Sequence, residues 1–278
     1  MAEIIGGIAT SHVPAVGVAI DRDRTKEAYW EPYFAKLAPL RSWVKELNPD
    51  VCVLVYNDHA TAFSLEVIPT FAIGLAESYR PADEGYGRRP VPDVEGHPEL
   101  AWHLAQTLIL DEFDMTLVNE MDVDHGLTVP LSVMFGEPDA WPCPVVPILV
   151  NVVQFPPPTG RRCYKLGQAL RRAIGSFPGT ERVLVVGTGG MSHQLQAERA
   201  GLLNPEFDHR FIDLLVNRPE DAAAIEHNEY LREAGSEGIE LVMWLVMRGA
   251  LPEHVTEVYR ATHLPTSNTH NGLVALAP

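Results

Sequence analysis

Four short apolar segments of this chain are each followed by a polar run that contains a histidine. The clearest is Val51–Tyr56 (VCVLVY), whose β-branched and aromatic residues are typical of a buried strand and which is followed by Asn-Asp-His. Ligands of open α/β sheets bind beyond the carboxyl ends of strands. If the four strands lie side by side in one sheet, the histidines converge at one edge of that sheet. They are His12, His59, His125 and His193.

The predicted strands alternate with segments of helical spacing. We expect strands over 1–9, 51–56, 115–119, 145–153, 182–186, 255–262 and 272–276, with a further piece of ambiguous type over 63–75. We expect helices over 26–47 (interrupted by Pro32 and Pro39), 98–111, 161–177, 207–216, 219–232 and 237–248. This alternation predicts a single α/β domain over 1–278, with a central, largely parallel or mixed sheet flanked by helices. The active site is expected at the carboxyl ends of its strands.

Composition excludes several classes of function. The formal net charge of −16 argues against binding nucleic acid through a basic surface. No apolar run reaches the 18 residues of a membrane span, and the N-terminus lacks the basic and apolar regions of a signal peptide. The three cysteines are too scattered for a disulfide framework, and we interpret them as core residues in a reducing compartment. We therefore expect a soluble, cytoplasmic protein.

An acidic residue stands in a strongly apolar helical segment near the end of the sequence. Glu240 lies in the middle of the predicted helix 237–248 (EGIELVMWLVMR). A buried carboxylate needs a partner, and a metal ion is a suitable one. Two imidazoles and one carboxylate form the ligand set of non-haem Fe(II) oxygenases, although zinc accepts the same ligands. The alternative is that some of the histidines are structural and that Glu240 pairs with an arginine.

Three further features have more than one interpretation. Asp58 either orients the imidazole of His59 or caps the turn that follows the strand. The glycine run Gly187–Gly190 matches neither a P-loop nor a dinucleotide fingerprint, so it predicts a tight turn that brings backbone close to a ligand. The segment 79–97, rich in proline, glycine and charge, predicts a long surface loop that serves as a lid or contact surface.

Five motifs carry a resemblance to a known family. They are TSHVPA (10–15), LVYNDHA (54–60), MDVDHG (121–126), GTGGMSHQLQ (187–196) and GSEGIELVMWL (235–245). Together they closely resemble the protocatechuate 4,5-dioxygenase β-subunit family of class III extradiol ring-cleavage dioxygenases. The resemblance extends along nearly the whole chain, including the 79–97 loop and the PTSNT segment.

The resemblance implies a mononuclear Fe(II) site. It places the iron ligands on His12, His59 and Glu240. It also implies that His193 is the acid/base residue and that His125 lines the same site, where it contacts substrate or oxygen.

The resemblance further implies a reaction and a partner. Protocatechuate would be cleaved with O₂ to 4-carboxy-2-hydroxymuconate semialdehyde in aromatic catabolism, with Ser267 and Asn268 near the substrate carboxylate. Gallate and 3-O-methylgallate are alternative substrates. A small separate α subunit is implied, in an α2β2 assembly, and a homo-oligomer is the alternative. Two other classes remain open: a zinc-dependent hydrolase using the same ligands, and a non-catalytic binding protein.

Overall fold

The computed structural model describes residues 1–278, except for the side chains of residues 265 and 266. Its central sheet contains β1 (Glu3–Thr10), β2 (Val51–Tyr56), β3 (Phe71–Gly74), β6 (Met115–Val118), β7 (Val145–Val150), β8 (Arg182–Thr188), β9 (Thr256–Thr266) and β10 (Thr269–Ala277). The strand order is β6-β3-β7-β2-β8-β1-β10-β9. Strands β7, β2, β8 and β1 are parallel neighbours, whereas β10 and β9 continue the sheet in antiparallel fashion. A separate two-stranded ribbon is formed by β4 (Ser78–Tyr79) and β5 (Val94–Glu95).

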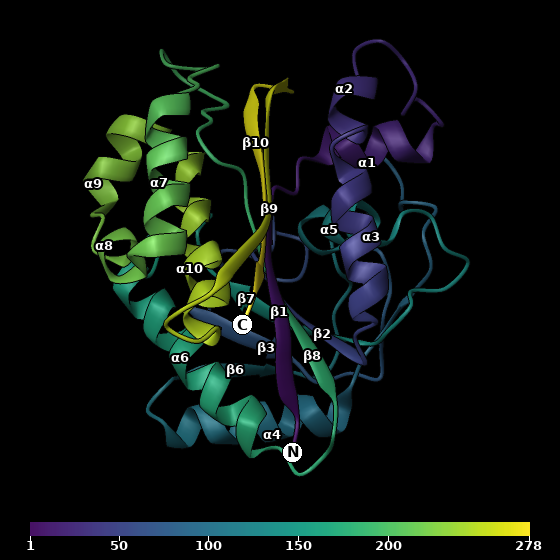
Figure 1. Ribbon diagram of the computed structural model, residues 1–278, viewed down its shortest axis with the longest axis vertical. Helices are drawn as coiled ribbons and strands as arrows, with labels where there is room; N and C mark the ends of the chain where they lie inside the picture. Colours follow the sequence, from purple (N-terminus) through teal and green to yellow (C-terminus); the bar gives the residue numbers. More distant parts are fainter.

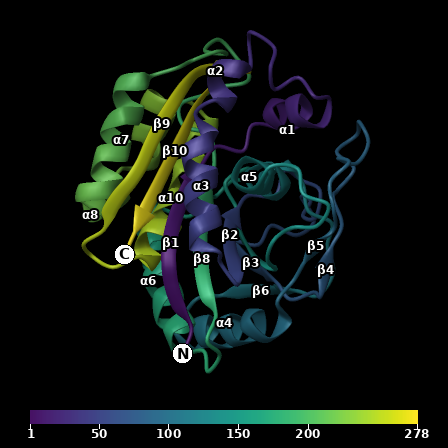
Figure 2. The same cartoon turned by 45° about the vertical axis from the view of Figure 1, so that its right-hand side comes forward.

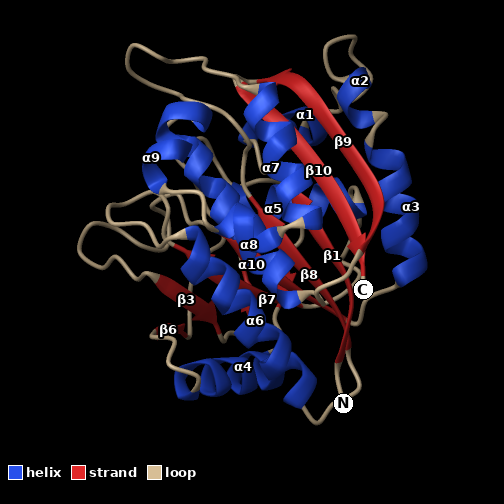
Figure 3. Cartoon of the chain, turned by 60° about the vertical axis from the view of Figure 1, so that its left-hand side comes forward, coloured by secondary structure: helices blue, strands red, loops and turns tan.

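Helices cover both faces of this sheet (Figures 1 and 3). One face carries α1 (Pro14–Asp21), α2 (Glu31–Phe34), α3 (Leu37–Leu47) and α5 (His125–Phe135). The other carries α4 (Pro98–Leu110), α6 (Gly160–Ser176), α7 (Pro205–Asn217), α8 (Pro219–Ala223) and α10 (Leu241–Ala250). Short α9 (His227–Glu229), the π-helical η1 (Tyr230–Ala234) and the 3₁₀-helical η2 (Glu237–Glu240) lead into α10. The prediction of a mixed central sheet flanked by helices is therefore confirmed.

Strand β2 illustrates why the sequence folds in layers. All six of its residues are buried, because helices cover both of its faces. Successive side chains of a strand point to opposite faces. Accordingly Val51, Val53 and Val55 pack into one core, while Cys52, Leu54 and Tyr56 pack into the other.

The C-terminal hairpin differs from its prediction. The sequence favours a loop between the predicted strands 255–262 and 272–276, but β9 and β10 extend to a two-residue turn formed by Ser267 and Asn268. Both residues have positive φ, 51° and 60°, as the tight hairpin turns that match the strand twist require. The polar residues Thr269, His270 and Asn271 suggested a loop, but the structure buries all three within β10, where His270 Nδ1 donates to Asp208 Oδ2 at 2.7 Å.

Three predicted helices differ from the structure in their bounds or their breaks. The segment 219–232 is divided among α8, α9 and η1, and Pro39 lies within the first turn of α3 without interrupting it. The segment 237–248 is a 3₁₀ turn followed by α10, so Glu240 lies at the N-terminal end of that helix rather than in its middle. No helix in the described part of the chain is long and apolar enough to cross a bilayer.

Candidate active site

Three of the four histidines are delivered by neighbouring parallel strands. His12 follows β1, His193 follows β8 and His59 follows β2, so the carboxyl ends of these strands bring the three segments together. His125 arrives differently. Its preceding strand, β6, is at the far edge of the sheet, and the residue instead occupies the first position of α5.

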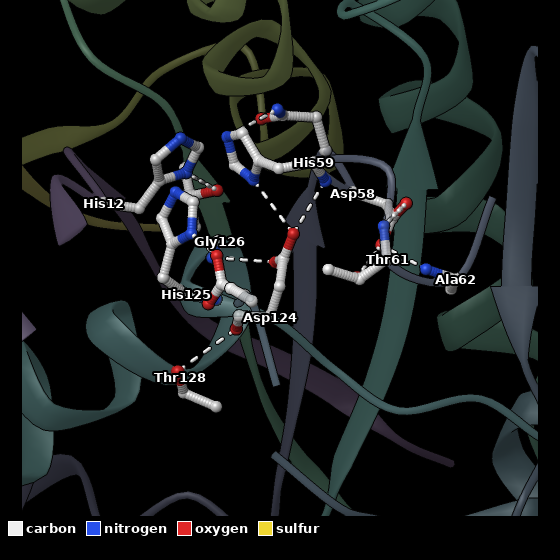
Figure 4. Close-up of polar contacts among 12 residues, drawn as sticks. His12, Asp58, His59, Thr61, Ala62, Asp124, His125, Gly126 and Thr128 are labelled. Carbon is white, nitrogen blue, oxygen red and sulfur yellow. Dashed lines mark hydrogen bonds and ion pairs between the residues drawn. The ribbon is translucent and has the colours of Figure 1, made fainter. Parts of the chain in front are cut away.

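The four histidines and Glu240 nevertheless form one group. The ring centroid of His59 lies 5.2 Å from that of His12 and 3.9 Å from that of His125, with which it stacks (Figure 4). Glu240 Oε2 lies 3.3 Å from His12 Nε2 and 3.8 Å from His193 Nε2, and its Oε1 lies 4.0 Å from His59 Nε2. The four histidines therefore lie close together at one edge of the sheet, as the sequence predicted.

Glu240 is buried and is surrounded by histidines rather than by an arginine. Its described ion pairs all involve imidazoles, and Gly190 donates its backbone N–H to Oε2 at 2.6 Å. Gly189 makes this approach possible, because it has a φ of 135° and a Cβ there would lie 2.7 Å from Glu240 Cβ. The glycine run thus brings backbone to a candidate ligand residue.

The second nitrogen of each candidate ligand histidine is held by a neighbouring group. His12 Nδ1 is hydrogen-bonded to Thr188 Oγ1 at 3.0 Å, and its buried Nε2 has no hydrogen-bond partner among the described groups. His59 Nδ1 donates to Asp124 Oδ2 at 2.9 Å (Figure 4). The Nε2 atoms of both rings lie toward Glu240, and that of His59 also accepts a hydrogen bond from Asn57 Nδ2 at 3.0 Å. Support of the other ring nitrogen by a neighbouring group is typical of metal-binding histidines.

The donor set fits a metal ion. Nitrogen and oxygen ligands lie about 2.0 to 2.2 Å from a transition metal, so ligands at right angles are about 3 Å apart. The separation of 3.3 Å from Glu240 to His12 Nε2 is close to this value, and the 4.0 Å to His59 Nε2 is wider but still below the about 4.2 Å that separates two opposite ligands. His12, His59 and His125 also have ring nitrogens within 4.8 Å of one another. Glu240 and His125 are therefore the two candidates for a third ligand: Glu240 offers a carboxylate that faces both Nε2 atoms, whereas His125 directs its Nδ1 to Glu84.

The electrostatics of the site favour an anionic carboxylate among imidazoles. Burial alone would raise the pKa of Glu240, but His12, His193 and His59 together hold it well below its usual range. Burial lowers the pKa of His12, in spite of the nearby Glu240. For His59, burial lowers the pKa, but the combined attraction of Asp124, Glu240 and Glu84 outweighs it and raises the pKa to about 9. A metal ion bound there would therefore displace a proton from His59.

His193 presents a basic nitrogen to the site. Its Nδ1 donates to the carbonyl oxygen of Met191 at 2.8 Å, which assigns the hydrogen to Nδ1 and leaves the Nε2 lone pair free in the neutral ring. That Nε2 faces Glu240. A neutral imidazole oriented in this way accepts a proton from a group placed in the cleft.

These side chains line a cleft of about 470 Å³, a volume suited to a single aromatic ring with substituents. Ser267 also lines it, whereas Asn268 is not among its lining residues. The walls are mainly apolar, and the described lining contains no lysine or arginine. The lining residues are His12, Val13, Pro14, His59, His125, Val152, Val153, Gly190, His193, Leu195, Ser236, Glu237, Ile239, Glu240, Ser267 and Thr269.

Two acidic residues of the site were not predicted from the sequence. Asp124 holds His59, and Glu84 holds His125 through Oε2 at 2.5 Å from Nδ1. Asp58 caps the following turn instead, accepting from the backbone N–H groups of residues 61, 62 and 63. The position of Asp124 next to His125 in the DVDHG motif was a usable signal, but its partner is 65 residues away in sequence.

Comparisons with known proteins show which family the sequence resembles. A profile of the family described as the catalytic LigB subunit of aromatic ring-opening dioxygenase matches residues 6–272. Gallate dioxygenase of Pseudomonas putida KT2440 is 46% identical over 185 residues, which are 66% of this chain and 54% of that protein. A 2,3-dihydroxyphenylpropionate/2,3-dihydroxicinnamic acid 1,2-dioxygenase of Paraburkholderia xenovorans LB400 is 30% identical over 271 residues, covering 81% of this chain and 82% of that protein.

The fold itself has a solved counterpart. The crystal structure of the uncharacterized protein JW3007 from Escherichia coli K12 aligns with a TM-score of 0.58 at 14% identity, covering 98% of this chain and 99% of that one. This likeness concerns the fold alone. The chain spans about half the length of the gallate dioxygenase that it matches. The family profile, in contrast, extends over nearly all of the sequence, and the chain belongs to the family of catalytic subunits of aromatic ring-opening dioxygenases.

Proposed function

We propose that this chain catalyses Fe(II)-dependent extradiol cleavage of a catechol-type aromatic acid by O₂, in the cytoplasm. The leading substrate is protocatechuate, and the product would be 4-carboxy-2-hydroxymuconate semialdehyde. One observation carries the proposal: the Nε2 atoms of His12 and His59 meet the buried carboxylate of Glu240 beside His193, in a cleft of the size of an aromatic ring. Membership of the ring-opening family supports the same reaction.

His12, His59 and Glu240 would hold the iron. Two neutral nitrogens and one carboxylate leave a bound Fe(II) with net positive charge and open positions, which suits an anionic substrate and O₂ together. When bound, Fe(II) would acidify the vicinal hydroxyls of the substrate and provide the electronic path to O₂.

His193 would move the protons. Its Nε2 is positioned to accept a proton from a substrate hydroxyl, and the resulting imidazolium would return it later in the reaction. An imidazole suits both directions because its unperturbed pKa lies near neutral pH. His125, on another side of the cleft, would orient the substrate or oxygen through the edge of its ring.

Gallate is a second candidate substrate, because the relative with 46% identity is named gallate dioxygenase. Protocatechuate and gallate differ by one ring hydroxyl and share the carboxylate. The described cleft lining offers this carboxylate no lysine or arginine. The hydroxyl of Ser267, which lines the cleft, would therefore hold it, and Asn268, which is outside the lining, would take part only if its side chain turns toward the bound substrate.

A separate α subunit in an α2β2 assembly is part of the proposal. Apolar side chains are exposed at the mouth of the cleft: Val153 is 47% exposed and Leu195 is 55% exposed. Val67 and Ile68 adjoin Val153 in a neighbouring hollow, and Phe155 is 88% exposed. A polypeptide covering this rim would bury apolar surface and exclude water from the cleft.

Oxygen uptake tests the reaction. Protein loaded anaerobically with Fe(II) is mixed with protocatechuate, gallate, 3-O-methylgallate or catechol, with and without a candidate α subunit, and the ring-opened product is followed by absorbance. We expect oxygen consumption with at least one aromatic acid. Activity that needs zinc and consumes no oxygen would instead identify a hydrolase. A His193→Phe variant that retains full turnover would contradict the role of that residue.

A further inference from the structure

The side chain of Glu84 holds His125 at two points. Its Oε2 accepts from His125 Nδ1 at 2.5 Å, and its Oε1 accepts from the backbone N–H of the same residue at 3.0 Å. Both side chains are largely buried, with 11% of Glu84 and 9% of His125 exposed. The backbone N–H of His125 belongs to the first turn of α5, so a carboxylate there is also favoured by the helix dipole.

The same arrangement occurs at the neighbouring histidine. Asp124 Oδ2 accepts from both the backbone N–H and Nδ1 of His59, at 2.6 and 2.9 Å. In each case one carboxylate fixes both the main chain and the ring of a cleft histidine. The two rings held in this way stack on each other, with centroids 3.9 Å apart.

Glu84 belongs to the segment that joins β4 to β5 and projects from the sheet beside α5 (Figure 2). This segment is attached to the loop preceding α5. Ala82 donates its N–H to Val123 O at 2.8 Å, and Arg88 pairs with Asp122 at 3.2 Å. The main-chain hydrogen bond from Ala82 thus aligns the segment so that Glu84 reaches the histidine, and the exposed Arg88 pair adds little to this.

We propose that Glu84 is a positioning residue, which fixes the ring of His125 with its Nδ1–H directed away from the cleft and its Nε2 edge presented to the substrate. The expected effect on turnover rests on the proposed function, whereas the orientation of the His125 ring does not. Without Glu84, the His125 ring loses its only described acceptor at Nδ1 and can rotate or change tautomer. The β4–β5 segment would then control catalysis through one carboxylate, without contacting the iron ligands by hydrogen bonds in the described part of the chain.

Steady-state kinetics with the full chain tests the effect on turnover. Glu84→Ala should lower kcat by about 10- to 100-fold, as is typical when a group that orients a site histidine is lost. KM should change by less than about threefold, because Glu84 does not line the cleft. Glu84→Gln should recover part of the loss, since its amide oxygen still accepts one of the two hydrogen bonds. The amount of bound iron should be unchanged.

Arg88→Ala is the matched control. Arg88 lies in the same segment, its side chain is 49% exposed, and it contacts Asp122 rather than a site residue. We expect kcat within about twofold of wild type, because exposed ion pairs contribute little. If Arg88→Ala lowers kcat as much as Glu84→Ala does, loosening of the β4–β5 segment explains both losses. The proposed positioning role of Glu84 is then wrong.

Nitrogen-15 NMR of the metal-free, histidine-labelled protein provides a readout that does not need activity. The Nδ1–H of His125 should give a downfield signal protected from solvent exchange, identified by its absence from His125→Gln. The signal should be lost in Glu84→Ala and kept in Arg88→Ala. A signal that persists in Glu84→Ala overturns the proposal. If the wild-type protein lacks ring-cleavage activity, the proposed function is wrong. The NMR experiment still shows whether Glu84 accepts the hydrogen bond from His125 Nδ1.

Discussion

Asp124 Oδ2 accepts hydrogen bonds from both the backbone N–H and the ring Nδ1 of His59, at 2.6 and 2.9 Å. Asp124 itself is fixed by its position at the N-cap of α5, where its Oδ1 accepts from the N–H of Gly126 (Figure 4). The attraction of His59 and His125 outweighs burial and lowers the pKa of Asp124 to about 2. A charged acceptor therefore directs Nε2 of His59 toward Glu240.

Asp124→Asn should weaken iron binding by about 10- to 100-fold, because loss of the charge makes the His59 ring less basic and less well oriented. Anaerobic titration of the metal-free protein with Fe(II) measures the change. Asp58→Asn is the control, since Asp58 contacts the 61–63 backbone rather than the ring. Equal losses of affinity in the two variants would contradict the assignment of Asp124 as the partner of His59.

Glu240→Gln should weaken iron binding by at least about tenfold, because it removes the anionic ligand from the proposed set. Ligand binding to the native state raises its stability, so the increase in Tm on adding Fe(II) should shrink in this variant. His193→Phe should keep that increase and lose turnover. If Glu240→Gln binds iron normally while His125→Gln does not, the three-histidine group is the metal site instead.

Gly189→Ala should destabilise the protein by about 1 to 3 kcal/mol, the cost of holding a side chain in a strained backbone conformation. Its φ is 135°, and the added Cβ would meet Glu240 Cβ at 2.7 Å. Urea denaturation measures the free energy of unfolding. Gly175→Ala in α6 is the control: nothing lies within 4 Å of the position that its added methyl group would occupy, and alanine is the better helix former, so stability should be kept or increased.

Arg89→Ala should lower the free energy of unfolding by about 3 to 5 kcal/mol, the usual loss when one partner of a buried ion pair is removed. Arg89 forms two hydrogen bonds with Asp21, at 2.9 and 2.7 Å, and only 9% of the residue is exposed. Arg24→Ala is the control. Arg24 makes a similar pair of bonds with Glu27, but on the surface, so its loss should leave stability near that of wild type.

The sequence was most informative where one strand leads directly into one site residue. His12, His59 and His193 follow strands whose apolar character is unmistakable, and the parallel sheet brings them together. Glu240 is recognisable from its apolar surroundings, although its place at the start of α10 is not. These features depend on local pattern and on one general property of parallel sheets, so they are visible without coordinates.

The hydrogen-bond partners of the site histidines could not be predicted where they are distant in sequence. Asp58 is adjacent to His59 and is its nearest candidate partner in the sequence, yet the ring bonds to Asp124. Glu84 stands in a loop rich in glycine and charge, where nothing marks one acid above the others. Such pairings depend on how loops from separate strands fold over the sheet edge, and the chain order does not specify that geometry.

The place of β1 in the sheet has a consequence for synthesis of the protein. This first strand lies between β8 and β10, both of which are made late in translation. Its apolar residues therefore have no sheet partner while the intervening segments emerge from the ribosome, and sheets that depend on such distant pairings fold slowly and expose aggregation-prone surface. His12 can lie beside His59 only after β8 has been inserted between β1 and β2, so capture of a metal ion by the proposed ligands would report that β8 is in place.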